Sequence, residues 1–344
     1  MNKIIYIRCE NNIHEHRVAV IPSDIKILID NGYEIYIENS KNRVYLDDEY
    51  KNNGAIITDL HWYDEQFKDA LIVGLKEIKD LEKLNKHTHL YFSHTYKNQI
   101  NSKNILLKFA ESQSVIHDFE YFTDDNNKRI ISFGYYAGIM GCILGLLQYI
   151  SKKLNNTNIV NLKYCDDKNE YITYIYQNNY LFNKVRIAII GDGNCTSGVK
   201  YILDLLKIEY TIIYKKFNKS DILFPSYDII YNCIVLDEKY NEIWFDNKTH
   251  FYRPIIICDI SCDYEKKNNP IAIYNKPTTW DNPIYSYDKF VDIIAINNLP
   301  SLIPKESSMY FSNKCVQLIL EYTNDINKYW LNNKKVYLNK ISEL

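Results

Sequence analysis

The sequence predicts an α/β fold with two parallel sheets, and three observations support this prediction. Short runs rich in β-branched residues alternate with helical stretches, as in parallel sheets whose strands are connected by helices. One apolar run, 185–190, is followed directly by a glycine-containing turn and a helical stretch. The 344 residues also suffice for two domains that each bury a core.

The first third of the chain predicts one parallel sheet. A helix is expected to begin at Pro22 and to end near Gly32, because proline favours the first turn of a helix and glycine favours its end. A second helix is expected over 104–111. The expected strands are 4–7, 34–37, 55–57, 71–73, 89–92 and 115–117.

The rest of the chain predicts a second sheet. A long apolar helix is expected over 134–154, and the polar segment 155–168 has no apolar period, which is typical of a loop. The glycine turn after 185–190 leads into a helix to about residue 208. Further strands are expected at 211–214, 227–234, 254–260 and 291–296, followed by helices at 307–323 and 326–330.

Composition excludes several classes of partner. The 41 Lys and Arg residues nearly balance the 43 Asp and Glu residues, so no basic surplus predicts nucleic-acid binding. The longest apolar run, 139–150, is shorter than the ~20 residues of a membrane span. Eight scattered cysteines without a CxxC pair, and polar residues in place of a secretory signal at the start, predict a reduced cytoplasmic protein. His87, His89 and His94 lack zinc-ligand spacing, so no metal is expected.

The segment 191–198, with the sequence GDGNCTSG, is the candidate dinucleotide site. It follows a strand and opens a helix, where glycines let backbone amides and a helix N-terminus hold a pyrophosphate. Thr196 stands where the GxGxxG pattern has its third glycine, and a β-branched residue there should crowd the helix against the sheet. A tight turn without any ligand would have the same glycines, so that alternative stays open.

The end of the next strand bears on the choice of nucleotide. NAD-binding units place an Asp or Glu there for the adenosine ribose, whereas this chain has Tyr214, Lys215 and Lys216. Lysines cannot accept the ribose hydrogen bonds and would favour a 2′-phosphate, so the residues favour NADP or a weakened site. Two solvated lysines at a strand end are the alternative.

Titratable residues follow two strands of the first sheet. Lys76 and Glu77 come after 71–73, and His94 comes after 89–92. Parallel strands bring these residues to one edge, where open α/β sheets bind ligands, and a lysine and a histidine there suit acid and base catalysis. The alternatives are a surface lysine and a histidine that closes a strand by hydrogen bonding.

Three further charged residues stand near predicted strand ends. Glu120 follows strand 115–117, and Arg17 and Arg129 are isolated arginines. An arginine fork suits a substrate carboxylate. Each residue could equally be a solvated surface charge.

Eight stretches in the same order along the chain resemble the lysine-forming saccharopine dehydrogenases, relatives of alanine dehydrogenase and of the transhydrogenase α/β domains. The stretches are IRCENNIHEHRVAVIPSDIKILIDNGYEIYIE, IVGLKEI, YFSHTYKNQ, HDFEYFTDDNNKRIISFGYYAG, IIGDGNCTSG, YNCIVL, CDISCD and NNLPSLIPKESS. The resemblance implies two Rossmann-like α/β domains with parallel sheets and an interdomain active-site cleft. The substrate-side domain would comprise 1–133 and 310–344, and the dinucleotide domain 134–309.

The resemblance also implies an activity: saccharopine, NAD+ and water would give L-lysine and 2-oxoglutarate, or the reverse. Lys76 would be the base and His94 the group that activates water. Residues implied to bind the substrate or to tune these two groups are Arg17, Glu77, Lys97, Glu120 and Arg129. Those implied to bind the cofactor are Gly191, Gly193, Asn194, Cys195, Ser197, Lys215, Cys233, Asp259 and Asn297. A monomer is implied.

Three departures from the family pattern leave alternatives open. They are Thr196, Lys215, and the pair Asn297 and Asn298 where the family has an Asp-His pair, so Lys97 would lose its ion-pair partner. A family member with altered preference between NAD and NADP fits these changes. A catalytically silent relative that acts as a binding protein also fits them, and a dehydrogenase of another amino acid is the third alternative.

Overall fold

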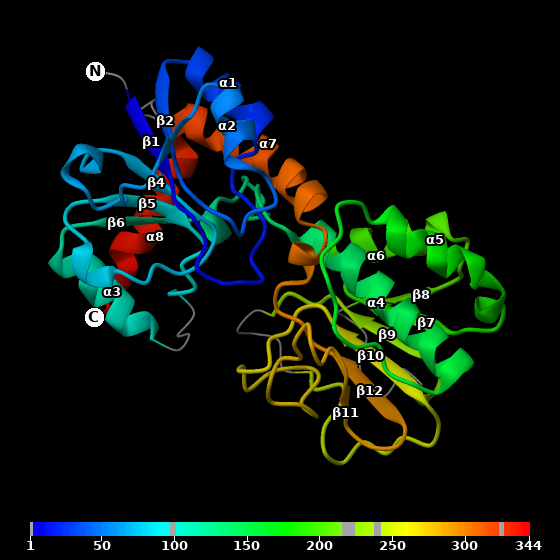
Figure 1. Cartoon of the computed structure of the whole chain (residues 1–344). Coiled ribbons are helices and arrows are strands. Elements are labelled where there is room, and N and C mark those ends of the chain that lie inside the picture. The colour runs from blue at the N-terminus through cyan, green and yellow to red at the C-terminus, as the bar shows by residue number, and fades with distance from the viewer. Residues whose placement is uncertain (1–2, 97–100, 215–223, 237–241, 323–326) are drawn as a thin grey trace. The chain divides into compact units, whose positions relative to one another are not determined.

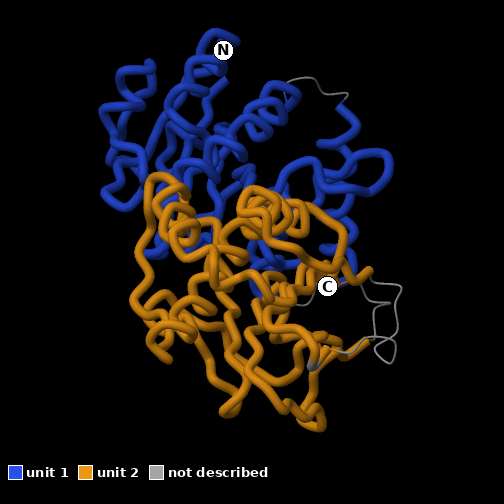
Figure 2. Tube along the Cα trace, turned by 90° about the vertical axis from the view of Figure 1, so that its right-hand side faces the viewer, with its two compact units in different colours: residues 1–132, 304–344 blue, residues 133–303 orange. Residues whose placement is uncertain are grey.

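The computed structural model describes residues 3–96, 101–214, 224–236, 242–322 and 327–344. The chain divides into two compact units (Figure 2), the first comprising Met1–Ser132 and Pro304–Leu344 and the second comprising Phe133–Ile303. Each unit contains one six-stranded sheet. The C-terminal segment of the chain therefore belongs to the same unit as the N-terminal segment.

The sheet of the first unit is parallel throughout (Figure 1), with the order β3-β2-β1-β4-β5-β6. Between β1 and β4 the strand order reverses direction, which creates a switch point where open α/β sheets bind ligands. The strands are β1 (Lys3–Ile7), β2 (Tyr33–Glu38), β3 (Ile56–Thr58), β4 (Leu71–Val73), β5 (Thr88–Tyr91) and β6 (Val115–Asp118).

Helices cover both faces of this sheet, which is why its central strands are apolar runs. In β4 all three residues are buried. One face packs against a core that includes Phe109 and Tyr337 from α3 and α8, and Figure 1 shows α1, α2 and α7 on the other face. The helices are α1 (Pro22–Asp30), α2 (Asp47–Asn52), α3 (Ser102–Glu111), α7 (Pro304–Tyr322) and α8 (Lys328–Ser342).

Hydrogen bonds attach the two C-terminal helices to the N-terminal part of the first unit. The hydroxyl of Tyr33 donates to the carbonyl of Ile319 in α7 at 3.1 Å. The hydroxyl of Tyr337 in α8 donates to the carbonyl of Ser114 at 2.6 Å. These partners are more than 200 residues apart in the chain, so the first sheet needs the C-terminal segment to complete its covering layers.

The sheet of the second unit has the order β11-β12-β10-β9-β7-β8, and only β11 is antiparallel to its neighbour. Its strand order reverses between β7 and β9, which gives this unit a switch point of its own. The strands are β7 (Ile187–Ile190), β8 (Thr211–Ile213), β9 (Ile229–Asn232), β10 (Ile255–Asp259), β11 (Tyr285–Ser286) and β12 (Val291–Ile294).

The two faces of the second sheet are covered differently. One face packs against α4 (Gly134–Asn155), α5 (Asn169–Gln177) and α6 (Asn194–Leu205). The other face is covered by aromatic and aliphatic side chains from segments that contain no α-helix in the described part of 224–290, among them Trp244 and Phe245. No described helix is long and apolar enough to cross a membrane.

Helices α4 and α6 approach each other closely through two glycines. A Cβ atom on Gly138 would overlap the carbonyl oxygen of Cys195, and a Cβ atom on Gly198 would overlap that of Tyr135. Thr196, expected to crowd the helix against the sheet, is buried within this arrangement. Helix α6 therefore makes its close approach to α4. Gly198, two residues after Thr196, permits this approach.

The predicted α/β fold class is confirmed, and the differences concern individual elements. Helices α2 and α5 and strand β11 are not predicted, and α8 extends to Ser342 instead of ending at residue 330. Helix α8 buries only Trp330, Asn333 and Tyr337, at a spacing of three and four residues. Because one of these is polar and the rest of the helix is rich in Lys and Asn, its apolar period is weak.

Candidate active site

The carboxyl edge of the first sheet brings residues from distant parts of the chain together at the switch point. Strands β1 and β4 pair in register, with Ile7 opposite Val73. The residues that follow them, Arg8 to Glu10 and Gly74 to Lys76, therefore lie side by side. This edge is where the sequence places Lys76.

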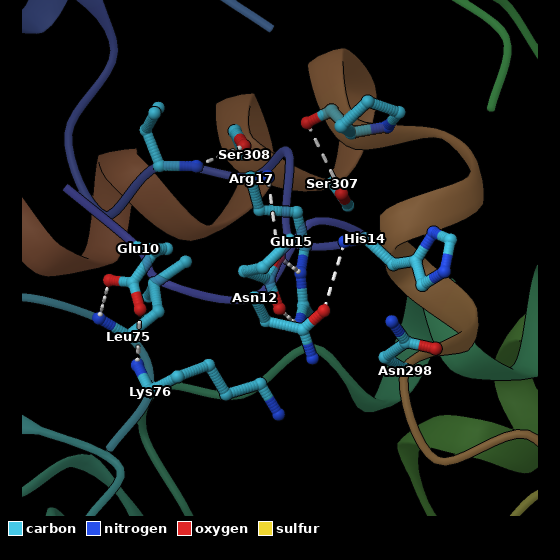
Figure 3. Close-up of polar contacts among 12 residues, drawn as sticks. Glu10, Asn12, His14, Glu15, Arg17, Leu75, Lys76, Asn298, Ser307 and Ser308 are labelled. Atoms are coloured by element: carbon cyan, nitrogen blue, oxygen red, sulfur yellow. Dashed lines mark hydrogen bonds and ion pairs between the residues drawn. The ribbon is translucent and has the colours of Figure 1, made fainter. Parts of the chain in front are cut away.

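The backbone around Lys76 is held by side chains that follow β1. The Glu10 carboxylate accepts hydrogen bonds from the N–H groups of Leu75 at 2.6 Å and of Lys76 at 2.9 Å (Figure 3). The guanidinium of Arg8 donates to the carbonyl oxygen of Lys76 and lies 3.4 Å from Glu10. The Lys76 side chain is half-buried, and Figure 3 shows it extending away from Glu10.

A buried ion pair lies in the loop after β1. Arg17 donates two hydrogen bonds to the two carboxylate oxygens of Glu15, at 2.6 and 2.5 Å. Burial alone would raise the pKa of Glu15, but the Arg17 guanidinium outweighs it and lowers the pKa, with a further contribution from Lys76. Glu15 therefore stays ionised, and the charge of Arg17 is largely compensated within the unit.

Helix α7 anchors this loop. The hydroxyl of Ser308 accepts a hydrogen bond from the N–H of Val18 at 3.0 Å, and the hydroxyl of Ser312 accepts one from Ile21, also at 3.0 Å. Both hydroxyls come from the helix that opens the C-terminal segment of the first unit. The position of Arg17 thus depends on α7.

His94 follows β5 on the same edge of the sheet. It is half-buried, and its φ of 52° lies in the left-handed region that few residues other than glycine adopt. Its ring is stacked on that of Phe92, with ring centroids 6.4 Å apart. The unusual backbone conformation sets the direction in which the imidazole leaves the strand.

Asp118 fixes the residue directly before His94. Its carboxylate accepts hydrogen bonds from the N–H of Ser93 at 3.1 Å and from the hydroxyl of Ser93 at 2.5 Å, and that hydroxyl is 2.7 Å from the hydroxyl of Thr95. Burial raises the pKa of Asp118 to about 6, although the Ser93 hydrogen bond lowers it in part. Asp118 thus links β6 to the histidine loop.

The remaining predicted substrate residues are spread along this edge. Glu120 and Arg129 are both half-buried, and their charged atoms are 3.6 Å apart. The N–H of Glu120 donates to Asp118 at 2.8 Å. Glu77 is exposed. Lys97 lies outside the described residues.

The second unit carries the glycine turn at its own switch point. Gly191 has a φ of 115°, and a Cβ atom there would lie 3.0 Å from the carbonyl oxygen of Cys233. Gly193 has no described atom within 4 Å of where its Cβ would be, and it caps α6 without a side-chain hydrogen bond. The first amides of α6 therefore have no side-chain cap at this end, which is the chemistry expected of a helix N-terminus that binds a pyrophosphate.

Other predicted cofactor residues differ in their exposure. Asn194 and Cys195 are half-buried, and Ser197 is exposed, with its hydroxyl donating to the carbonyl of Gly193 at 3.3 Å. Cys233 is buried after β9, and burial raises the pKa of its thiol well above the usual value. Asn297 is exposed. Lys215 lies outside the described residues.

The carboxylate of Asp259 has three partners within the second unit. It accepts hydrogen bonds from Asn232 at 2.9 Å, from the hydroxyl of Tyr274 at 2.6 Å and from the N–H of Cys262 at 3.1 Å. Burial raises its pKa, and the bonds from Tyr274 and Asn232 lower it in part. Asp259 thus holds the ends of β9 and β10 together beside the glycine turn.

A cavity in the first unit is too small for an amino-acid substrate. Its volume is only ≈ 20 Å³, which is room for about one water molecule. Its lining includes Arg8, Glu10, Glu15, Arg17 and Gly74. Within this cavity the charged groups pair with one another, Arg8 with Glu10 and Arg17 with Glu15.

Sequence reasoning did not single out three of these residues. The side chains of Arg8, Glu10 and Glu15 are buried, and each binds a part of the chain that contains a predicted site residue. Arg8 and Glu10 directly follow β1, so the strand-end argument applied to Lys76 and His94 could have found them.

Comparisons with known proteins agree with this arrangement. A family model described as "Alanine dehydrogenase/PNT, N-terminal domain" matches residues 6–140. Saccharopine dehydrogenase (NAD(+), L-lysine-forming) from Schizosaccharomyces pombe is 30% identical, with 99% of each chain covered. The protein of the same description from Candida glabrata is 30% identical over 98% of this chain and 96% of its own.

Two solved structures share the fold. An L-alanine dehydrogenase has a TM-score of 0.72 at 14% identity and covers 97% of this chain and 94% of its own. A transhydrogenase from Sinorhizobium meliloti has a TM-score of 0.63 at 12% identity and covers 93% and 94%. With the full-length sequence similarity, these results establish that the chain belongs to the family of saccharopine dehydrogenase (NAD(+), L-lysine-forming).

Proposed function

We propose that this protein is a saccharopine dehydrogenase, which converts saccharopine, an oxidised nicotinamide dinucleotide and water into L-lysine and 2-oxoglutarate, or catalyses the reverse. The observation that supports this best is the clustering of proton-transfer groups at one sheet edge. Lys76 and His94 follow the adjacent strands β4 and β5, and Lys76 lies at the switch point. Family membership over nearly the whole chain supports the same conclusion.

The nicotinamide dinucleotide, when bound, supplies the hydride acceptor for the C–H bond of the substrate. The second unit would hold it through Gly191, Gly193 and the start of α6, together with Asn194, Cys195 and Ser197. Cys233, Asp259 and Asn297 complete the edge. NAD is the proposed nucleotide, and Lys215 leaves NADP as the alternative because it replaces the acid that would bind the ribose.

Lys76 takes the proton from the secondary amine of saccharopine. A lysine can act as a base only when it is neutral, so an uncompensated carboxylate beside it would oppose this role. The two buried carboxylates closest along the loop, Glu10 and Glu15, are each paired with an arginine. This pairing supports the proposed role because it limits the negative field at Lys76.

His94 activates the water that attacks the oxidised substrate and serves the later proton transfers. Glu77 and Glu120 tune these two groups, and Arg17, Arg129 and Lys97 serve the substrate carboxylates. The protein is proposed to act as a monomer in the cytoplasm on these small molecules, without a nucleic-acid or membrane partner. None of the eight cysteines, all of which lie in the described residues, is in a disulfide bond, which is consistent with a reduced compartment.

Variants at the two proton-transfer residues test this proposal. Wild-type protein should oxidise NADH or NADPH in the presence of L-lysine and 2-oxoglutarate, and Lys76→Met and His94→Gln should each lower kcat about 10²- to 10⁴-fold. Lys26→Met is the control, because Lys26 is an exposed lysine paired with Asp30 on α1. Folded wild-type protein with no turnover and no thermal stabilisation by either nucleotide would favour the catalytically silent alternative.

A further inference from the structure

We propose that Arg8 and Glu10 are positioning residues for Lys76, which fix the peptide groups from which its side chain projects. This role rests on the proposed function, in which Lys76 is the base. The two residues act on the backbone of Lys76 and need no contact with the substrate. They would form a built-in clamp at the switch point of the first sheet.

The clamp begins with the carboxylate of Glu10. It accepts the N–H of Leu75 at 2.6 Å and the N–H of Lys76 at 2.9 Å, so both oxygens are used by consecutive peptide groups (Figure 3). A carboxylate offers two acceptor oxygens, so each amide has an oxygen of its own. The two amides belong to residues 65 and 66 positions away in the chain, in the turn that follows β4.

Arg8 completes the clamp from the other side of the same residue. Its guanidinium donates to the carbonyl oxygen of Lys76 and also lies 3.4 Å from the Glu10 carboxylate. Lys76 is therefore bound at both its N–H and its C=O. The N–H of Arg8 donates to the carbonyl of Val73 at 3.0 Å, which extends the pairing of β1 with β4 up to the clamp.

Strand β5 holds the same turn from the opposite side. The N–H of Gly74 donates to the carbonyl of Leu90 at 3.0 Å, and the carbonyl of Leu75 accepts from the N–H of Phe92 at 3.3 Å. Gly74 also makes room for the clamp, because a Cβ atom there would overlap the guanidinium of Arg8. The turn from Gly74 to Lys76 is thus held from both neighbouring strands.

The cost of burying this pair argues for a positioning role. The side chains of Arg8 and Glu10 are only 3% and 7% exposed. A buried ion pair loses hydration and adds little net stability compared with apolar residues of similar size. The pair supplies directed hydrogen bonds to the peptide groups of Lys76, which apolar side chains could not supply. A displacement of a catalytic group by about 1 Å can lower the rate about 10²-fold. Hydrogen bonds that fix the position of Lys76 would therefore favour catalysis.

Two variants and a matched control test the clamp. Glu10→Gln keeps the shape of the side chain but replaces one acceptor oxygen by a donor. Arg8→Lys keeps the charge but cannot reach the Lys76 carbonyl and Glu10 together. Arg253→Lys is the control, since Arg253 also binds one backbone carbonyl, that of Ser226, and one carboxylate, that of Asp228, in the second unit.

The first readout is amide hydrogen exchange at Leu75 and Lys76, which does not depend on activity. Glu10→Gln should speed exchange about tenfold at the one of these amides that loses its acceptor oxygen, as expected for the loss of a charge-assisted hydrogen bond. The second readout is kinetic. Both Glu10→Gln and Arg8→Lys should lower kcat by about 10²-fold while KM for L-lysine and 2-oxoglutarate changes little. Arg253→Lys should leave both readouts at wild-type values.

The outcomes separate this inference from the proposed function. If wild-type protein has no activity, the proposed function fails, and hydrogen exchange still decides whether the clamp exists. Unchanged exchange in Glu10→Gln would overturn the clamp, and so would a fall in kcat without faster exchange. If Glu10→Gln does not fold, Arg8→Lys carries the test, and wild-type kcat in folded Arg8→Lys would overturn the inference.

Discussion

Asp118, the last residue of β6, accepts two hydrogen bonds from Ser93, the residue directly before His94. This contact links two neighbouring strand ends and holds the backbone that carries the imidazole. Burial raises the pKa of Asp118 to about 6. The group that holds His94 in place therefore titrates close to neutral pH, and this has a measurable consequence for stability.

The pKa of Asp118 predicts the sign of a pH effect. Because the folded-state pKa of about 6 exceeds the unfolded value of 3.8, this group stabilises the fold below pH 4, and the stabilisation is lost as pH rises through 6. The difference is about 3 kcal/mol at most. Urea unfolding at several values between pH 4 and 7 should show this component in the wild type and not in Asp118→Asn. Identical pH dependence in both proteins would contradict the assignment.

His89 should lower the stability of the first unit as pH falls, which is opposite to the effect of Asp118. Its ring lies between Trp62 and Phe109, at centroid distances of 4.8 and 5.5 Å, and neither ring nitrogen has a hydrogen-bond partner among the described residues. Burial lowers its pKa well below 6.5. The folded state therefore excludes a proton that the unfolded chain binds, and stability falls by about 1.4 kcal/mol per unit as pH drops below 6.5.

Replacing His89 by Phe removes this penalty. His89→Phe should flatten the dependence of unfolding free energy on pH between 6.5 and 5, without loss of stability at pH 7, because it also removes two buried polar atoms that lack partners. His250→Phe changes an exposed histidine and is the control. A variant at position 89 that keeps the full wild-type slope would show that His89 is protonated in the folded state or is already partnered.

Two glycines of segment 191–198, one before α6 and one within it, should separate nucleotide binding from stability. Gly198→Ala should destabilise the protein by about 1–3 kcal/mol, because its Cβ would overlap the carbonyl of Tyr135. Gly193→Ala faces open space and should cost less than about 1 kcal/mol, yet should weaken nucleotide binding where the pyrophosphate approaches the backbone. Thermal unfolding and nucleotide titration measure the two effects. Equal nucleotide affinity in Gly193→Ala and the wild type would argue against this turn as the binding site.

The buried pair Glu15 and Arg17 should be strongly coupled. Arg17→Met removes the bidentate partner of a buried carboxylate and should cost about 3–5 kcal/mol of stability. The double variant Glu15→Gln with Arg17→Met should be more stable than Arg17→Met alone, because the buried charge is also removed. Urea denaturation of the single and double variants measures the coupling. Additive effects in this cycle would mean that the two groups act independently.

The fold was predictable where burial dominates and less so elsewhere. The central strands of both sheets are apolar runs because both of their faces are covered, and the sequence marks them clearly. Helix α8 was predicted only as a short segment, because Asn333 occupies one of its three buried positions and donates to the carbonyl of Asp118. That hydrogen bond spans 215 residues and leaves no local signal.

The candidate site shows the same division. The edge position of Lys76 and His94 follows from strand order, which the sequence predicts. The hydrogen-bond partners of Lys76 cannot be predicted from strand order. Glu10 reaches the backbone of Leu75 and Lys76 only through the register of β1 with β4. The position of the residue before His94 likewise depends on a distant partner, because Asp118 at the end of β6 binds Ser93 in the loop after β5.

The central claim is tested most directly by identifying the product. Purified protein is incubated with L-lysine, 2-oxoglutarate and NADH, and in parallel with NADPH, and the mixture is analysed by mass spectrometry. The account predicts that saccharopine accumulates in step with nucleotide oxidation, with NADH preferred, and that Lys76→Met forms little of it. Folded wild-type protein that forms no saccharopine with either nucleotide would contradict the account.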